Sequence, residues 1–143
     1  EHGDSSFVPW SLANISNVPI DKYASCMTNQ DKIVPSLIHS EVEDYIRKSG
    51  AKVIQRKGAT FYAVAISVCH IIRCLFSDMD TTLTVSTMMH GEYGIDDVAL
   101  STLAIVDHNG ISGKLTAPLT DDEIASLKKS ADALKDVIKQ LEF

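Results

Sequence analysis

The first residues of the chain, Glu1-His2-Gly3-Asp4-Ser5, bring together side chains that could carry out acid–base chemistry. A histidine changes charge near neutral pH, so His2 is suited to donate or to accept a proton. Gly3 allows a ligand or a second backbone segment to come close, and Asp4 can accept hydrogen bonds from the amides of a turn. Taken alone, the cluster is weak evidence, because a solvated chain terminus is the commoner state of such residues.

A second group of candidate residues lies in a helical pattern that begins at Ser36. One face of this pattern has residues at spacings of four and three: Ile38, Val42, Tyr45, Ser49 and Val53. Ser49 is the small polar member of the face, and Gly50 follows it at a cost of about 1 kcal/mol of helix propensity relative to alanine. Small residues at such a position either let another backbone approach or leave room for a ligand, and the pattern alone does not decide between the two.

Other kinds of site are not indicated by the sequence. The chain has five histidines and three cysteines, and no histidine pair has the spacing of metal ligands on a helix. Cys69, His70 and Cys74 lie in the apolar run from Ala59 to Phe76, which predicts a core helix with buried thiols rather than a zinc site. Neither a phosphate-binding glycine loop nor a dinucleotide fingerprint is found, and a serine nucleophile elbow is also missing.

The composition is that of one domain with an ample core. The chain has 143 residues, of which 45% are hydrophobic, and its 13 Lys and Arg against 19 Asp and Glu give a formal charge of −6. The charges are scattered without a basic face, so neither nucleic acid nor an anionic membrane is an expected partner. An odd number of cysteines, two of them in an apolar run, favours reduced thiols in a cytoplasmic protein.

The elements that would position these residues form an α+β domain, with an antiparallel sheet packed with long α-helices. A strand stub at Phe7–Trp10 and a strand over Asn14–Ile20 precede the helix that begins at Ser36, and the stretch Lys57 to Thr60 joins that helix to the apolar one. The expected meander has three strands: Thr81–Met89, Val98–Val106 and Ile111–Thr116. Asn109-Gly110 predicts a hairpin between the last two strands. Thr120 and Glu123 predict a capping box for a final helix with an apolar stripe: Ile124, Leu127, Ala131, Leu134, Ile138 and Leu141.

Several stretches of the sequence together resemble one family. EHGDSSFVPWS (1–11) resembles the active-site segment of the L-lactate dehydrogenases, within the lactate/malate dehydrogenase family. GAKVIQRKGATFYAVA resembles the segment that joins two long helices there, HGEYGIDDVALS a strand-turn-strand, and LTDDEIASLKKSADALK the C-terminal helix. The segments follow the family's order and spacing over essentially all 143 residues. The resemblance is strongest to the bacterial L-lactate dehydrogenases.

The resemblance implies a role for each candidate residue. His2 would be the acid/base, giving a proton to the keto oxygen of pyruvate while NADH delivers a hydride to the carbonyl carbon. Thr60 would limit the space for the substrate side chain, and Ser49 and Gly50 would line the same pocket. Val64, one turn beyond Thr60, would contact the nicotinamide ring of NAD, although an ordinary core position is an equally good reading of this valine.

The same resemblance implies that this chain is the C-terminal substrate and catalytic domain (1–143) of a homotetrameric, cytoplasmic, NAD-dependent L-lactate dehydrogenase. The NAD-binding domain, the aspartate that orients the histidine and the arginine that binds the substrate carboxylate would then lie upstream of Glu1, and the isolated chain would be inactive. Alternative enzymes are a malate dehydrogenase and an L-2-hydroxyacid dehydrogenase for bulkier side chains. A non-catalytic oligomerisation or interaction module is the alternative from another class.

Overall fold

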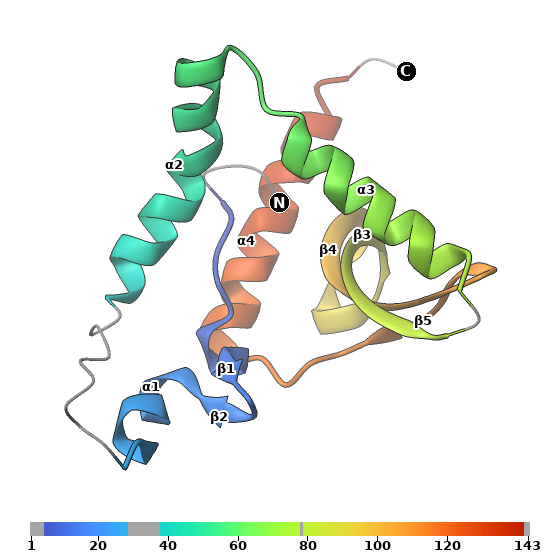
Figure 1. Ribbon diagram of the computed structural model, residues 1–143. Helices are drawn as coiled ribbons and strands as arrows, with labels where there is room; N and C mark the ends of the chain where they lie inside the picture. The colour runs from blue at the N-terminus through green and yellow to red at the C-terminus, as the bar shows by residue number, and fades with distance from the viewer. Residues whose placement is uncertain (1–4, 29–37, 78, 142–143) are drawn as a thin grey trace.

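The computed structural model describes residues 5–28, 38–77 and 79–141, and its fold is the predicted α+β arrangement (Figure 1). Three strands form an antiparallel sheet in the order β3-β4-β5, with β3 at Thr81–His90, β4 at Asp96–Asp107 and β5 at Gly110–Leu115. The long helices are α2 (His39–Lys57), α3 (Tyr62–Leu75) and α4 (Asp121–Ile138). Within these described residues, no helix combines the length and the apolar character needed to cross a membrane.

Turn chemistry sets the ends of the strands as the sequence predicts. His108 and Asn109 form the turn between β4 and β5, and Gly110 takes the positive φ of 108° that opens β5. The Asn109 amide donates a hydrogen bond to Asp107 Oδ1 at 2.6 Å, which is typical of an aspartate at a turn. The hairpin predicted from Asn-Gly is therefore confirmed.

The N-terminal region is more finely divided than the sequence suggests. Instead of a strand near Asn14–Ile20, the structure has a small hairpin of β1 (Asn14–Ile15) and β2 (Val18–Pro19). Ser16 and Asn17 between them have φ values of 51° and 66°, as in the two-residue turns that suit a hairpin. The hairpin follows a 3₁₀ turn, η1 (Trp10–Leu12), and leads into α1 (Ile20–Tyr23) and a second 3₁₀ turn, η2 (Ala24–Cys26).

The core lies between α4 and the sheet. Leu127 and Ala131 of α4 pack with buried residues of the sheet and its turn, which are Met89, Ile95, Val98 and Leu100. The predicted capping box is present: Thr120 Oγ1 accepts from the Glu123 amide at 3.3 Å, and Glu123 Oε2 accepts from the Thr120 amide at 2.9 Å. The apolar stripe predicted for this helix extends beyond the core: its last two members, Ile138 and Leu141, are exposed.

The sequence prediction of a core helix over Ala59 to Phe76 is wrong for the described structure. Cys74 is the buried residue of α3, whereas Cys69 and His70 are exposed, and Ile66 is 71% exposed. Most side chains of α3 are apolar, and β4 is the element that this helix contacts most among the described residues. Contact along one side leaves the rest of its apolar surface uncovered. The same holds for the apolar face of α2, where Tyr45 is 63% exposed.

Candidate functional site

Four of the five candidate site residues flank the joint between α2 and α3, the two helices that meet at an angle in Figure 1. Ser49 and Gly50 lie in α2, Thr60 lies in the connection, and Val64 lies in the first turn of α3. Gly58 ends α2 with a φ of 85°, and its amide donates to the Ile54 carbonyl at 2.7 Å, as a glycine helix cap does. His2, the predicted acid/base, lies outside the described residues.

Ser49 is half-buried and Gly50 is exposed on α2. The Ser49 hydroxyl donates to the Tyr45 carbonyl one turn earlier, at 2.5 Å, which satisfies this side chain within its own helix. A Cβ placed on Gly50 would meet no atom within 4 Å. The described chain therefore does not require a glycine here for a close approach of another segment. The space beside Gly50 is therefore available to a ligand or to another part of the protein.

Thr60 lies in the connection just before α3, and Val64 lies in the first turn of that helix. Both are exposed, with Val64 at 55%, although Val64 is apolar. The preceding Lys57 places its Nζ 4.2 Å from the centre of the Phe61 ring and 3.4 Å from that of Tyr62, so cation–π contacts stiffen the joint. Ser49 is eight residues before the end of α2, which is roughly 12 Å along the helix axis. The structure thus places Ser49 and Gly50 in α2, Thr60 in the connection and Val64 at the start of α3.

The first described residues of the chain are held between α2 and α4 (Figure 1). Arg47 Nε donates to the Ser6 carbonyl at 3.2 Å, and Arg47 also forms an ion pair with Glu43 at 2.8 Å. The Ser5 and Ser130 hydroxyls are 3.2 Å apart, and Ser130 is buried. The segment that follows His2 in the sequence is thus anchored two residues before Ser49 on α2.

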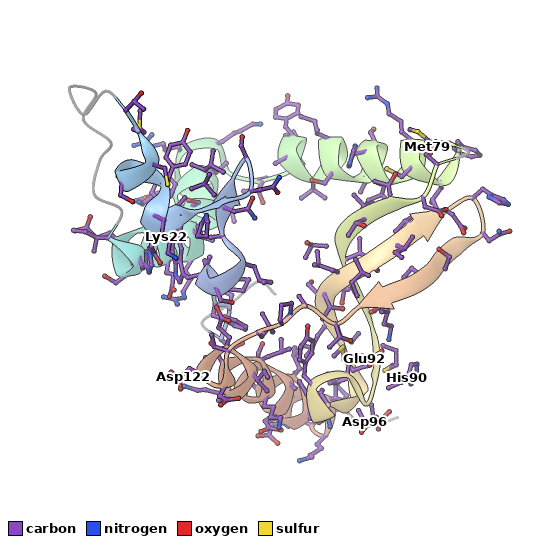
Figure 2. The ribbon with its side chains drawn as sticks, turned by 90° about the horizontal axis from the view of Figure 1, so that it is seen from below. Lys22, Met79, His90, Glu92, Asp96 and Asp122 are labelled. Carbon is purple, nitrogen blue, oxygen red and sulfur yellow. The ribbon has the colours of Figure 1, made fainter. Side chains whose placement is uncertain are left out.

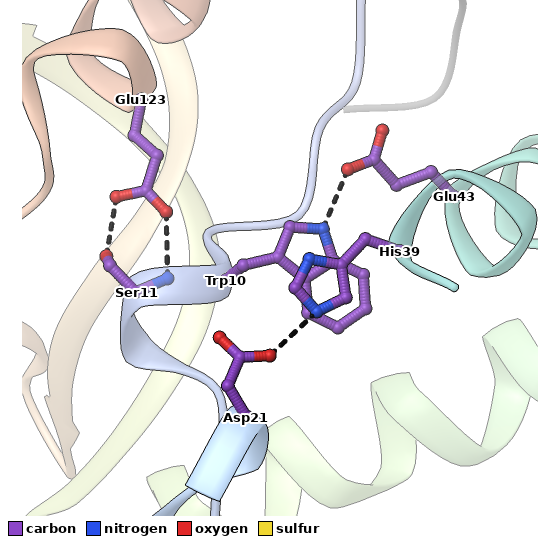
Figure 3. A network of polar contacts seen from close by, with 6 residues as sticks. All are labelled: Trp10, Ser11, Asp21, His39, Glu43 and Glu123. Carbon is purple, nitrogen blue, oxygen red and sulfur yellow. Dashed lines mark hydrogen bonds and ion pairs between the residues drawn. The ribbon is translucent and has the colours of Figure 1, made fainter. Parts of the chain in front are cut away.

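A further pair of contacts fixes this segment at Trp10 and Ser11 (Figure 3). Trp10 Nε1 donates to Glu43 Oε1 at 2.8 Å, and Glu123 accepts from the Ser11 amide at 3.0 Å and from the Ser11 hydroxyl at 2.5 Å. Burial alone would raise the pKa of Glu123, but the hydrogen bonds from Ser11 and Thr120 outweigh it and lower this pKa. The Glu123 carboxylate therefore serves two roles, because it caps α4 and holds η1 against the start of that helix.

The structure also contains a cavity of about 520 Å³ that the sequence did not reveal. Its walls come from the segment 5–12, from α2, from the sheet and from α4, and none of the four described candidate residues lines it. The lining is mostly apolar, including Phe7, Leu103 and Leu127, and its charged residues Glu43 and Arg47 neutralise each other. The walls are built from residues far apart in the sequence, so no local pattern marks this cavity. It is therefore separate from the substrate pocket that the resemblance implies around Ser49, Gly50 and Thr60.

A polar cluster at the turn between β3 and β4 stabilises the sheet (Figure 2). Lys114 of β5 pairs with Glu92 at 2.9 Å and donates to the Met88 carbonyl, and the His90 amide donates to Glu92 at 2.6 Å. The hydrogen bond from Lys114 is the main reason why the pKa of Glu92 is lowered to about 2. This cluster ties the turn to the edge strand. Throughout the described ranges, no group of three or more His, Cys, Asp or Glu side chains could hold a metal ion.

Comparison with known proteins places the whole chain in one group. Residues 1–142 match the family described as the lactate/malate dehydrogenase, alpha/beta C-terminal domain. The L-lactate dehydrogenase of Thermoanaerobacterium saccharolyticum is 42% identical over 148 aligned residues, and that of Acetivibrio thermocellus is 40% identical over 144. Each alignment covers 100% of this chain but only 45% and 44% of the relative. The chain therefore spans less than half the length of the curated relatives it matches.

Solved structures agree with the sequence comparison. The minor L-lactate dehydrogenase of Enterococcus mundtii, in a ligand-bound form, superposes with a TM-score of 0.87 at 28% identity, covering 100% of this chain and 44% of that one. The malate dehydrogenase of Archaeoglobus fulgidus in complex with NADH superposes with a TM-score of 0.81 at 30% identity, covering 100% of this chain and 42% of that one. Both structures contain the α+β arrangement described above.

Proposed function

Because the chain belongs to the lactate/malate dehydrogenase C-terminal domain family, we propose that it forms the substrate-binding and catalytic part of an NAD-dependent L-lactate dehydrogenase. The observation that carries the proposal is the match of the entire chain to L-lactate dehydrogenases at about 40% identity. The proposed enzyme interconverts pyruvate and L-lactate. Its nucleotide-binding part is supplied by residues outside these 143, because the sequence has no dinucleotide fingerprint.

In the proposed reaction His2 holds and transfers the proton. Protonated His2 donates to the keto oxygen of pyruvate as that oxygen gains negative charge, and neutral His2 takes the hydroxyl proton of lactate in the reverse direction. NADH, when bound, supplies the hydride to the carbonyl carbon. The geometry supports a role for the N-terminal segment, because Ser6, four residues after His2, is bonded to the helix that carries Ser49 and Gly50.

Val64 is proposed to contact the nicotinamide ring. A flat aromatic ring needs an apolar surface that is not already covered, and Val64 offers one on the first turn of α3, with 55% of its area exposed. This exposed apolar side chain is what supports the assignment of Val64 to the coenzyme. NAD is the cofactor we expect for the whole protein.

Thr60, Ser49 and Gly50 are proposed to line the pocket for the substrate side chain. Thr60, in the connection between α2 and α3, narrows the space between these helices. This favours a substrate with a methyl group, such as pyruvate, over one with a larger side chain. The open space beside Gly50 supports a ligand on this side of α2. The L-lactate dehydrogenase relatives favour a lactate enzyme over the malate and bulky 2-hydroxyacid alternatives.

The exposed apolar surfaces of α2 and α3 support a homo-oligomer, which we propose to be a tetramer in the whole protein. Ile46, Ile54, Ile66 and Ile72 are all exposed in the described chain. Contiguous apolar surface of this kind marks a region that another part of an assembly covers. A cytoplasmic location is proposed on the unpaired thiols: Cys26, Cys69 and Cys74 are all free.

A chimeric enzyme tests the proposed function. The region of the Thermoanaerobacterium saccharolyticum L-lactate dehydrogenase that precedes its match to this chain would be joined to residues 1–143. NADH oxidation would then be measured with pyruvate and with oxaloacetate. We expect turnover with a clear preference for pyruvate, and neither turnover nor saturable NADH binding by residues 1–143 alone. A preference for oxaloacetate would favour a malate dehydrogenase. A folded chimera that binds NADH but turns over neither substrate would contradict a catalytic role.

A further inference from the structure

Trp10, the only tryptophan of the chain, is docked on the first turn of α2 by two contacts (Figure 3). Its ring lies on the imidazole of His39, with the ring centres 3.9 Å apart and the planes inclined by 5°. Its Nε1–H donates to Glu43 Oε1, one helical turn after His39. His39 Nε2 is in turn 3.1 Å from Asp21 Oδ1 of α1. One imidazole therefore joins α2 to two elements of the N-terminal region, η1 and α1.

Both contacts of His39 would be strengthened by a proton on its imidazole. Two neutral aromatic rings prefer an offset or edge-to-face arrangement, because their faces carry like partial charge. A cation above an indole face is attracted to it instead, and tryptophan is the best partner for this interaction. The contact with Asp21 also gains strength when His39 is charged, because a hydrogen bond between two ionised groups is shorter and stronger than a neutral one.

Most charged groups on the elements packed around His39 would favour its protonated form. Glu41 and Glu43 lie in the first turns of α2, with Glu43 also bonded to Arg47, and Asp21 of α1 is followed by Lys22. From α4, Glu123 binds the neighbouring Ser11. The N-terminal end of α2 opposes a positive charge at His39 through its helix dipole. The contacts with Trp10 and Asp21 are therefore the specific interactions that a positive charge on His39 would strengthen.

We propose that His39 is a pH-dependent clamp that fixes the segment from Trp10 to Asp21 onto the first turn of α2. With a proton on His39 the stack and the ion pair are both made, and the segment is held firmly. Loss of the proton removes the charge from both contacts and loosens the segment. Because α2 also carries Ser49 and Gly50, the clamp sets how firmly the start of this helix is attached to the rest of the domain.

The single tryptophan provides a direct test in the 143-residue chain. A protonated imidazole in contact with indole quenches its fluorescence, so we expect Trp10 emission to fall as the pH is lowered from 8 to 5.5, the range in which histidines change charge. His39→Gln should abolish this change. His108→Gln is the matched control, since His108 lies in the turn between β4 and β5, and it should leave the change intact. A change that persists in His39→Gln, or none in the parent chain, would overturn the clamp.

Urea unfolding gives a second, independent readout. The difference in unfolding midpoint between the parent chain and His39→Gln should be larger at pH 5.5 than at pH 8, because both contacts of His39 depend on its charge. Effects of pH on all other groups cancel in this difference. Asp21→Asn should reduce the difference at pH 5.5 and leave it nearly unchanged at pH 8. A difference that is the same at both pH values would show that His39 acts only by packing, which would refute the proposal.

Discussion

Glu123→Ala tests how the segment that follows His2 is attached to the rest of the domain. The Glu123 carboxylate accepts hydrogen bonds from the Thr120 amide, the Ser11 amide and the Ser11 hydroxyl. Losing the carboxylate half of a capping box costs about 1 kcal/mol. Two further hydrogen bonds at a solvent-accessible position are worth roughly 0.5 kcal/mol each. We therefore expect a loss of about 2 kcal/mol in the free energy of unfolding.

Thermal and urea unfolding of the variants would measure this loss. A cost of this size lowers the melting temperature by roughly 6 °C in a chain of this length. Ser11→Ala should cost about 0.5 kcal/mol in the parent chain and nothing in the Glu123→Ala background, because its hydroxyl bonds to that carboxylate. Asp132→Ala, exposed on the same helix, is the control and should stay within about 0.5 kcal/mol of the parent.

The lowered pKa of Glu123 also predicts how the cost of Glu123→Ala changes with pH. The pKa of Glu123 is lowered in the folded chain, since the hydrogen bonds from Ser11 and Thr120 outweigh the opposing effect of burial. Its contribution is therefore fully present above the ordinary glutamate pKa of 4.5 and is lost as the pH falls through the lowered value. The loss of unfolding free energy caused by Glu123→Ala should therefore become smaller as the pH is lowered. Additive effects of Ser11→Ala and Glu123→Ala, or a cost independent of pH, would refute the assigned contacts.

Three other predictions follow from single side chains. Since the pKa of Glu92 is lowered to about 2, the urea midpoint should fall as the pH drops from about 4.5 toward 2, and Glu92→Gln should remove part of that fall. Leu100→Ala should cost about 3 kcal/mol of unfolding free energy because Leu100 is buried in the core, whereas Ile66→Ala, at an exposed site, should cost less than about 0.5 kcal/mol in this chain. In the chimeric enzyme, Thr60→Gly should raise kcat/KM for 2-ketoisocaproate relative to pyruvate by roughly 10- to 100-fold, and an unchanged ratio would remove Thr60 from the pocket.

Features governed by local rules were predictable from the sequence. The capping box of Thr120 and Glu123 and the hairpin at Asn109-Gly110 depend on residues within a few positions of each other. The alternating apolar pattern likewise identified β3, although its far end reaches His90 rather than Met89. The structure confirms these elements. They were predictable because the interactions that form them are between residues close together in the sequence.

Features that depend on distant contacts were not predictable in the same way. The apolar character of α3 indicated that it must be covered, but not by what, so its burial in this chain was wrongly expected. Ser49 is the small polar member of an otherwise larger helix face, and its hydrogen bond to the Tyr45 carbonyl accounts for the hydroxyl within the helix, so its role in the pocket is a proposal. The stack of Trp10 on His39 joins residues 29 positions apart in a pattern without a motif.

The most direct test of the proposed catalytic role is the turnover number of the chimeric enzyme with His2→Asn. Asparagine keeps a polar side chain of similar size but cannot donate a proton to the keto oxygen. We predict that kcat for pyruvate reduction falls by roughly two to four powers of ten, while the dissociation constant for NADH stays within a few-fold of the parent value. Turnover close to that of the parent chimera would contradict the account, because the proton would then have to come from another group.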